Sequence, residues 1–383
     1  MKLTLEELKN TILTMFGATH IADSTFQNVV DEISGLTMKC AKMVINESNF
    51  SHTIDDHFNG DDLPIGGFIE EYFNDMVAPI SYDPDGTNTL QPHYPTKMPA
   101  YYSYPLEGLN FPITIRKVEY QQFFTDAENA ARYIANLLKK HSDAQRIYRF
   151  GKKKALLGYF AKLAIDAKGN AGTFAANTAY QQGTYLQRSD AVEWGVVIKD
   201  IPATGGPTSW GDALNGGYIV LLGVVEEVAV PTDTASGEAF IKKVKADVEK
   251  AERPSNANNL AGAIIQPERS NMLLVLREGV MPSLEVDTMA GAFHRDDLDT
   301  GLKQIVVDGF GGWNEDAGGY LLDDYVIGMV LDERGAKLHL AEIQTDEQIN
   351  AEGHFYTIFT YSRYVPYISP YTYIKVYVDV SLQ

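Results

Sequence analysis

The sequence contains almost no cysteine, since Cys40 is the only one among 383 residues. A single cysteine excludes an internal disulfide and a cysteine-based zinc site, and it fits a reducing compartment. No apolar run approaches the roughly 18 residues that a membrane-spanning helix needs. Residues 1–7 lack a positively charged segment followed by an apolar run, so we expect neither a signal peptide nor a membrane partner.

Positive charge is also scarce. The chain has 32 Lys and Arg against 51 Asp and Glu, which gives a formal net charge of −19. Such a surface repels polyphosphate over most of its area and lacks the basic footprint of a general nucleic-acid binder. Hydrophobic residues make up 45% of the chain, and its length suggests two or three domains, each with a sizeable core.

The motifs of common catalytic sites are missing as well. No Gly-x-Ser-x-Gly sequence is present, and Phe150–Lys154 lacks the upstream glycine and the Ser or Thr of a phosphate loop. Asp308–Gly312 has the wrong glycine spacing for a dinucleotide turn and is interpreted as a tight turn. His52 and His57 have no third histidine nearby, and Asp83–Gly86 resembles only half of a calcium loop. We therefore predict no catalytic residues, no cofactor and no metal.

Helical periodicity is clearest in the first half of the chain. Residues 3–16 and 24–45 have apolar residues near helical spacing. Capping boxes at Thr125–Glu128 and Ser142–Gln145 predict two further helices, of which the second runs to about residue 167. The glycine-rich sequence at 169–172 predicts its end.

Residues 63–121 are different in character because they contain eight of the 16 prolines. Proline removes backbone donors and favours an extended chain, so this segment is poorly suited to a central sheet. Its tyrosines argue against disorder and favour an extended arm or loop ordered by contact with another molecule. The tyrosines that we consider candidates for such contacts are Tyr82, Tyr94, Tyr101, Tyr102 and Tyr104.

The second half of the chain is predicted to be mostly strands and loops, so the fold class is α+β. Apolar and β-branched runs predict several strands, and residues 237–252 have the pattern of an amphipathic helix. The predicted strands are 196–198, 218–225, 272–276, 305–307, 320–330 and 354–380.

One basic cluster contrasts with the acidic composition. It lies on the second capping-box helix and comprises Arg146, Arg149, Lys152, Lys153 and Lys154. One interpretation is a solvated helix face paired with acidic neighbours, in which each exposed pair contributes about 0–1 kcal/mol. The other is a patch that contacts DNA phosphate or an acidic loop of another subunit.

Several segments, in the same order and with compatible spacing, resemble the major capsid proteins of phi-29-like tailed bacteriophages. They are Leu63–Tyr72, Leu273–Val275, Leu284–Phe293, Val306–Phe310 and the aromatic region His354–Tyr364. This resemblance implies the Hong Kong 97-type capsid fold, with an N-terminal arm, an extended loop, a peripheral domain with a long spine helix, and an axial domain.

The resemblance also implies boundaries and partners. The implied parts are the N-terminal arm 1–55, the extended loop 56–121, the peripheral domain with its spine helix 122–168, the axial domain 169–353, and C-terminal strands 354–383 that return to the peripheral domain. The family assembles as pentamers and hexamers in the host cytoplasm. Its shells imply a scaffolding protein, a portal, packaged double-stranded DNA and a place in the virion.

Two alternatives remain open from the residues alone. An encapsulin-type nanocompartment shares this fold but encloses cargo enzymes instead of a genome. An acidic, tyrosine-rich chain is also compatible with a glycan-active enzyme or binding module, which would need two carboxylates in a shared cleft.

Overall fold

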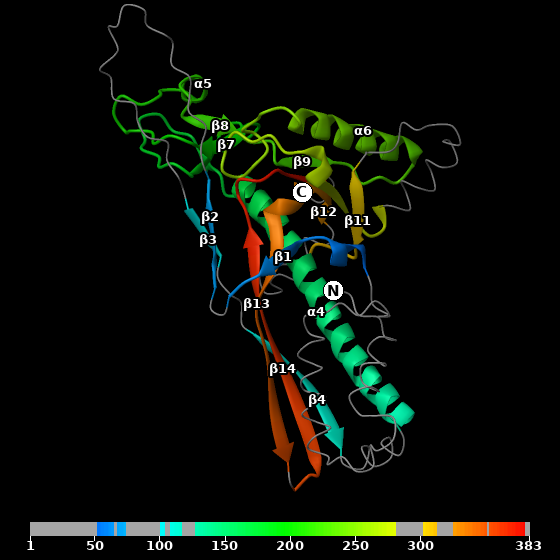
Figure 1. Cartoon of the computed structure of the whole chain (residues 1–383). Coiled ribbons are helices and arrows are strands. Elements are labelled where there is room, and N and C mark those ends of the chain that lie inside the picture. The colour runs from blue at the N-terminus through cyan, green and yellow to red at the C-terminus, as the bar shows by residue number, and fades with distance from the viewer. Residues whose placement is uncertain are drawn as a thin grey trace, which may run out of the picture. The chain divides into compact units, whose positions relative to one another are not determined.

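The computed structural model describes residues 52–64, 67–73, 100–103, 108–116, 127–280, 302–311, 325–350 and 352–379 (Figure 1). The helices predicted at 3–16 and 24–45 lie outside these residues. The chain divides into two compact units. Unit 1 comprises Met1–Ile69, Tyr104–Lys153 and Leu338–Pro366, and unit 2 comprises Glu70–Ser103, Lys154–Lys337 and Tyr367–Gln383.

Unit 1 contains a four-stranded sheet in the order β1-β13-β14-β4. Its strands are β1 Asn59–Asp62, β13 Ala336–Asn350, β14 Phe355–Ile368 and β4 Leu109–Arg116. β1 runs parallel to β13, whereas β14 is antiparallel to β4 over eight residue pairs, from Phe355–Arg116 to Ser362–Leu109. The long strands β13 and β14 form a hairpin that extends beside β4 in Figure 1. β13 was not predicted, because most of its residues beyond Ile343 are polar.

One helix, α4, runs from Ala127 to Gly169 and is shared between the units. Its 43 residues correspond to about 64 Å at 1.5 Å per residue. The prediction that a new helix opens at Ser142 is wrong, although the predicted end at the glycine-rich sequence is confirmed. Ser142 and Gln145 are buried in the middle of α4, and the Gln145 side chain bonds to His141 at 3.0 Å instead of capping a helix end.

Aromatic side chains pack α4 against the sheet of unit 1. The Phe111 ring from β4 meets the rings of His141 and Tyr148 edge-on, with centroids 5.9 Å apart in both pairs. Tyr148 in turn contacts Tyr364 of β14 at 5.8 Å. These rings connect the helix to two strands that are distant from it in sequence.

Unit 2 is built on a five-stranded sheet in the order β11-β10-β12-β15-β9. Its strands are β9 Val225–Val228, β10 Met272–Arg277, β11 Lys303–Val307, β12 Val326–Asp332 and β15 Ile374–Asp379. Every residue of β12 and β15 is buried. Near-continuous apolar runs are typical of strands covered on both faces, so these sequences were recognisable as strands.

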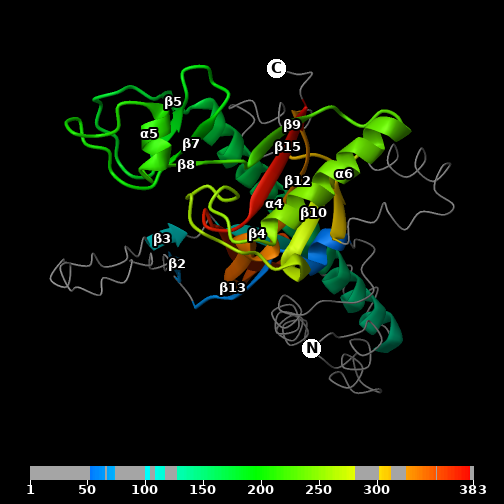
Figure 2. The same cartoon turned by 90° about the horizontal axis from the view of Figure 1, so that it is seen from above.

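Helix α6, Thr234–Ala251, covers one face of this sheet (Figure 2). Asp233 caps its N-terminus by accepting a hydrogen bond from the Ser236 N–H at 2.8 Å. Its buried residues Phe240, Val244 and Val248 pack into a cluster with side chains of β10, β12 and β15. The amphipathic helix predicted at 237–252 is confirmed, with its start three residues earlier.

A smaller sheet, in the order β5-β6-β7-β8, also belongs to unit 2. Its elements are β5 Gly172–Thr173, β6 Tyr185–Gln187, β7 Trp194–Val197, the short helix α5 Trp210–Asn215, which was not predicted, and β8 Ile219–Leu221. A separate two-stranded ribbon joins β2, Ile69–Tyr72, to β3, Ala100–Ser103. No helix among the described residues is long and apolar enough to span a bilayer.

The strand pairing concerns two of the parts that the family resemblance implies, the extended loop and the C-terminal strands. β1 and β4 lie within residues 56–121 but pair with β13 and β14, so these strands belong to the sheet of unit 1. The C-terminal residues 354–383 divide between the units, since β14 lies in the four-stranded sheet and β15 in the five-stranded sheet.

Candidate functional site

Lys153, the central residue of the predicted basic cluster, lies in the interior of unit 1. Its side chain is only 1% exposed. The Nζ group donates to the carbonyl oxygens of Ile54, Asp55 and His57 at 2.9, 3.1 and 2.6 Å. Lys153 therefore clamps the turn that precedes β1, and it does not belong to an exposed contact patch. The sequence pattern missed this because spacing on a helix does not reveal which face another segment covers.

Two neighbouring residues on α4 also have internal partners within unit 1. The Arg149 guanidinium donates to Asn59 Oδ1 at 3.0 Å. Lys152 Nζ lies 5.3 Å from the centre of the Tyr148 ring, which is a cation–π arrangement. Both side chains remain partly exposed, so these contacts leave some of their surface accessible.

The remaining two residues of the basic cluster, Lys154 and Arg146, belong to different units. Lys154 Nζ pairs with Asp308 Oδ2 at 2.9 Å, and both residues belong to unit 2. Arg146 is partly exposed and belongs to unit 1. The five basic residues thus do not converge on one point. Four of them present partly exposed cationic groups along α4, and Lys153 is excluded by burial.

Most of the candidate contact tyrosines lie outside the part of the chain that the structure describes. Tyr82, Tyr94 and Tyr104 lie outside the described residues, whereas Tyr101 and Tyr102 form the middle of β3. The ribbon of β2 and β3 therefore brackets the proline-rich segment at 74–99.

The base of this ribbon is attached to the loop that follows β14. The Ser369 hydroxyl donates to Glu71 Oε1 at 2.6 Å, and the rings of Phe73 and Tyr371 stack with centroids 4.6 Å apart. Burial and the nearby Glu71 carboxylate raise the pKa of Tyr371. Sequence reasoning missed these residues, because contacts between positions almost 300 residues apart have no local signal. The contacts of Glu71 and Phe73 hold the base of the ribbon at a defined place in unit 2.

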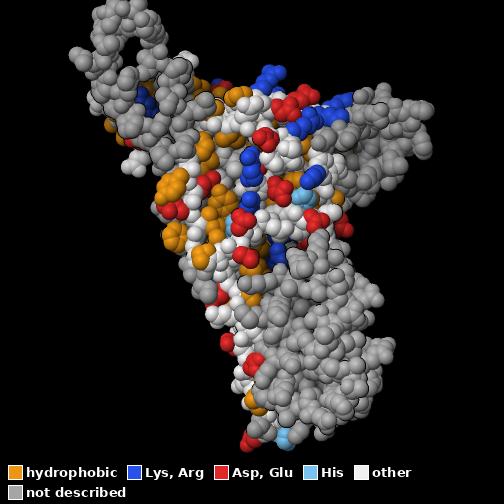
Figure 3. Space-filling model, viewed as in Figure 1, with side chains coloured by type: hydrophobic (Ala, Val, Ile, Leu, Met, Phe, Trp, Pro, Cys, Tyr) orange, Lys and Arg blue, Asp and Glu red, His pale blue; other side chains and the backbone are white. Residues whose placement is uncertain are grey.

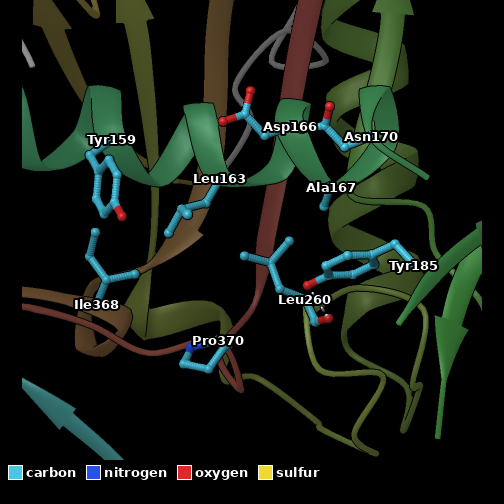
Figure 4. A pocket seen from close by; sticks show the side chains of 9 residues that line it. All are labelled: Tyr159, Leu163, Asp166, Ala167, Asn170, Tyr185, Leu260, Ile368 and Pro370. Carbon is cyan, nitrogen blue, oxygen red and sulfur yellow. Dashed lines mark hydrogen bonds between the residues drawn. The ribbon is translucent and has the colours of Figure 1, made fainter. Parts of the chain in front are cut away.

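A cavity of about 370 Å³ lies next to the same loop (Figure 4). Tyr159, Leu163 and Ala167 line it from α4, and Ile368 and Pro370 line it from the loop. The remaining lining residues are Asp166, Asn170, Tyr185 and Leu260. The Tyr185 hydroxyl donates to the Leu260 carbonyl at 3.1 Å. The lining contains no His, Cys, Ser or Lys, and its polar side chains are Tyr159, Asp166, Asn170 and Tyr185.

A cluster of polar side chains lies in the core of unit 2, between α6, β9 and β15. Lys375 Nζ donates to the Gly223 carbonyl at 2.7 Å and to Glu226 Oε2 at 2.9 Å. The Tyr377 hydroxyl donates to Asp247 Oδ2 at 3.2 Å, and its pKa is raised by burial and by that carboxylate. Each charge has a partner inside the cluster, so the arrangement connects three elements and leaves no free reactive group in it.

Metal chemistry finds no support in the described part of the chain. No group of three or more His, Cys, Asp or Glu is placed there to hold an ion. His52, one of the two histidines considered from the sequence, accepts the Ile54 N–H at its Nδ1 and packs edge-on against Phe150. What the described residues do show are anchored segments and partly exposed basic groups.

Comparison with known proteins agrees with this description. A family model described as Phi29-like phage major capsid protein matches residues 5–377. No curated protein sequence matches the chain.

Solved phage structures have a similar fold at low sequence identity. The capsid structure of Staphylococcus phage Andhra matches with a TM-score of 0.53 and 13% identity, over 88% of this chain and 89% of that one. A chain in the structure of the head fiber and inner core protein gp22 of native bacteriophage P68 matches with 0.51 and 13%, over 88% and 89%. The capsid structure of the cyanophage P-SCSP1u matches with 0.50 and 7%, over 89% and 91%.

Proposed function

The chain belongs to the family of Phi29-like phage major capsid proteins and has the Hong Kong 97-type capsid fold, and we propose that its copies form pentamers and hexamers of an icosahedral shell around double-stranded DNA. The observation that carries this proposal is the family match over residues 5–377. A helix of 43 residues and a hairpin of two long strands also suit a subunit that is completed by its neighbours.

We assign the parts of the subunit as the resemblance implies, with two refinements. The N-terminal arm is 1–55, the peripheral domain with its spine helix includes 122–168, and the axial domain is centred on 169–353. The extended loop, expected at 56–121, is narrowed to 69–103, because β1 and β4 on either side pair into the sheet of unit 1. The strands after residue 354 are divided between the two domains.

The partly exposed basic residues of α4 are proposed contacts in the shell. Arg146, Arg149, Lys152 and Lys154 would meet DNA phosphate or an acidic loop of a neighbouring subunit. The tyrosines of the extended segment, Tyr82, Tyr94, Tyr101, Tyr102 and Tyr104, would contact another copy. What supports the second assignment is the anchored base of the ribbon, which gives the proline-rich segment between β2 and β3 a fixed attachment point.

The proposed role is structural, without catalysis. As a phage capsid protein the chain is a component of the virion, and we propose that it assembles in the host cytoplasm with a scaffolding protein and a portal. The family supports a role without chemistry.

The test is to express the full chain, alone and with the scaffolding protein of the same phage, and to examine it by sedimentation and electron microscopy. Closed shells with packaged nucleic acid are expected in infected cells, and empty shells in the expression host. A chain that stays monomeric under every assembly condition would contradict the proposal. Shells filled with a cargo enzyme instead of DNA would favour the nanocompartment.

A variant sharpens this test. Residues 74–99 are replaced by a Gly-Ser linker of equal length, which keeps β2 and β3 connected but removes the tyrosines and prolines of the segment. We expect an unchanged melting temperature and no closed shells, because the segment contributes contacts to a neighbour. Normal assembly of this variant would refute the loop assignment.

A further inference from the structure

Within the described part of the chain, the sheet of unit 1 has an outer edge that is covered along only part of its length. β1 pairs with β13 at Leu338 and Leu340, and no described strand pairs with β13 beyond that point on this side. β13 nevertheless continues as a regular strand to Asn350. We call the segment from Glu342 to Asn350 the β13 edge. An uncovered strand edge presents a row of N–H and C=O groups on which another strand can pair.

The hydrogen bonds to β1 show which backbone groups point outward. The Leu338 N–H donates to the Phe58 carbonyl at 2.9 Å, and the Leu340 carbonyl accepts from the Leu63 N–H at 2.8 Å. Alternate residues of a strand direct their backbone groups to the same side. The same side therefore receives the N–H and C=O groups of Gln344, Asp346 and Gln348.

The opposite edge of the sheet is different because β4 contains Pro112, which lies opposite Phe359 of β14. Proline has no N–H, and within sheets it occurs on edge strands with its nitrogen toward solvent. The outer edge of β4 thus lacks a donor near its middle. Among the described residues, the β13 side therefore presents donors and acceptors to an added strand, whereas the β4 side lacks one donor.

Charge selects the kind of strand that fits. Between Leu338 and Ser362 the sequence contains no Lys or Arg and four acidic residues: Glu342, Asp346, Glu347 and Glu352. The residues from Asp346 to Asn350 are exposed, and Ile349 is 59% exposed. In Figure 3 the described surface at the lower end of this hairpin carries acidic side chains and no Lys or Arg. Such an edge repels an identical edge and polyphosphate, and it attracts positive charge.

From these observations we propose that the β13 edge binds a basic, extended segment of a partner protein as an added strand. The outward backbone groups supply the hydrogen bonds, the acidic side chains select a basic sequence, and Ile349 supplies an apolar contact. This is strand addition to an exposed sheet edge, with charge providing specificity. The proposal does not depend on shell assembly.

The test uses the full-length chain and a fluorescent peptide of alternating Lys and Val residues, followed by fluorescence anisotropy. A double variant, Gln344→Pro with Gln348→Pro, removes two outward N–H groups. The matched control, Gln344→Thr with Gln348→Thr, keeps both groups and the same net charge. We expect the proline variant to bind at least about tenfold more weakly than the threonine variant, because two hydrogen bonds are lost.

Two further arms separate strand pairing from simple attraction of charge. A Lys-Val peptide that is N-methylated on every residue, which removes the donors of both strand edges, and a Glu-Val peptide should both bind wild type weakly. Equal affinity of the proline and threonine variants would overturn the proposal. If the proline variant fails to fold, the affinities of the N-methylated and unmethylated Lys-Val peptides for the wild-type chain are compared instead. Equal affinities of these two peptides would overturn the proposal. A third outcome is self-association of the chain that only the proline variant loses, while its affinity for the peptide is unchanged. This result would show that the β13 edge pairs with a second copy of the chain, and it would also overturn the proposal.

Discussion

The two main sheets of this subunit differ in how much of their stability they can supply themselves. In the five-stranded sheet of unit 2, β12 and β15 are buried along their whole length, and α6 packs a continuous apolar cluster on one face. In the four-stranded sheet of unit 1, β13 is buried near Leu338 and exposed from Asp346 onward. A buried aliphatic side chain contributes about 1.5–3 kcal/mol, so the first sheet is a core in its own right.

This difference indicates that the two sheets have different roles in the subunit. A sheet covered on both faces tolerates little change and holds the subunit together. A sheet with an open edge and a polar outer half is available for contacts with other molecules. Substitutions in unit 2 should therefore affect folding, whereas those in the outer half of the β13–β14 hairpin should affect association.

The largest effect is expected in the core of unit 2. Leu274→Ala, at a side chain that is 2% exposed, should lower the free energy of unfolding by about 2–5 kcal/mol. Ile349→Ala, at an exposed residue of β13, should change it by less than about 0.5 kcal/mol. Chemical denaturation of both variants measures the contrast. Similar losses in the two variants would contradict the comparison.

A loss of about 2–3 kcal/mol is expected from Lys153→Met, because three carbonyl groups in unit 1 lose their shared donor. The matched control is Lys152→Met, which removes only a cation–π contact and should cost no more than about 1 kcal/mol. Thermal unfolding distinguishes the two. A mild effect at both positions would mean that the clamp on residues 54–57 is dispensable.

The smallest of the three effects depends on pH and concerns His141. Burial lowers the pKa of this histidine from 6.5 to about 4. The unfolded chain then binds more protons than the folded one between these values, so stability is complete above pH 6.5 and falls as the pH drops. At pH 5 the loss amounts to about 2 kcal/mol.

Hydrogen exchange can locate this acid sensitivity. Lower protection factors at pH 5 than at pH 7 are expected around His141 and in β4, whose Phe111 packs on the histidine, and not in β10 or β12. His141→Leu should remove most of this pH dependence. An unchanged pH profile in that variant would assign the effect to other groups.

Local patterns predicted the elements whose residues are uniform in character. β10 and β11 were recognisable as short apolar runs, and α6 by its amphipathic spacing. β13 escaped prediction because it passes from a buried to a solvent-facing environment along its length. The false boundary at Ser142 arose because a capping box is a local signal, and the tertiary packing of α4 gave Ser142 and Gln145 buried positions inside one helix.

The sequence by itself determined the α+β class, the absence of a recognisable catalytic motif and the family resemblance, because these depend on composition, periodicity and the order of short segments. Only the tertiary structure decided that Lys153 is a buried clamp, that Glu71 and Phe73 anchor the extended ribbon, and that no described strand pairs with β13 beyond Leu340 on its outer side. The physical reason is that burial and pairing are set by residues distant in the chain. Lys152 and Lys153 are identical neighbours in sequence, yet Lys152 remains partly exposed and Lys153 binds three carbonyl groups in the interior.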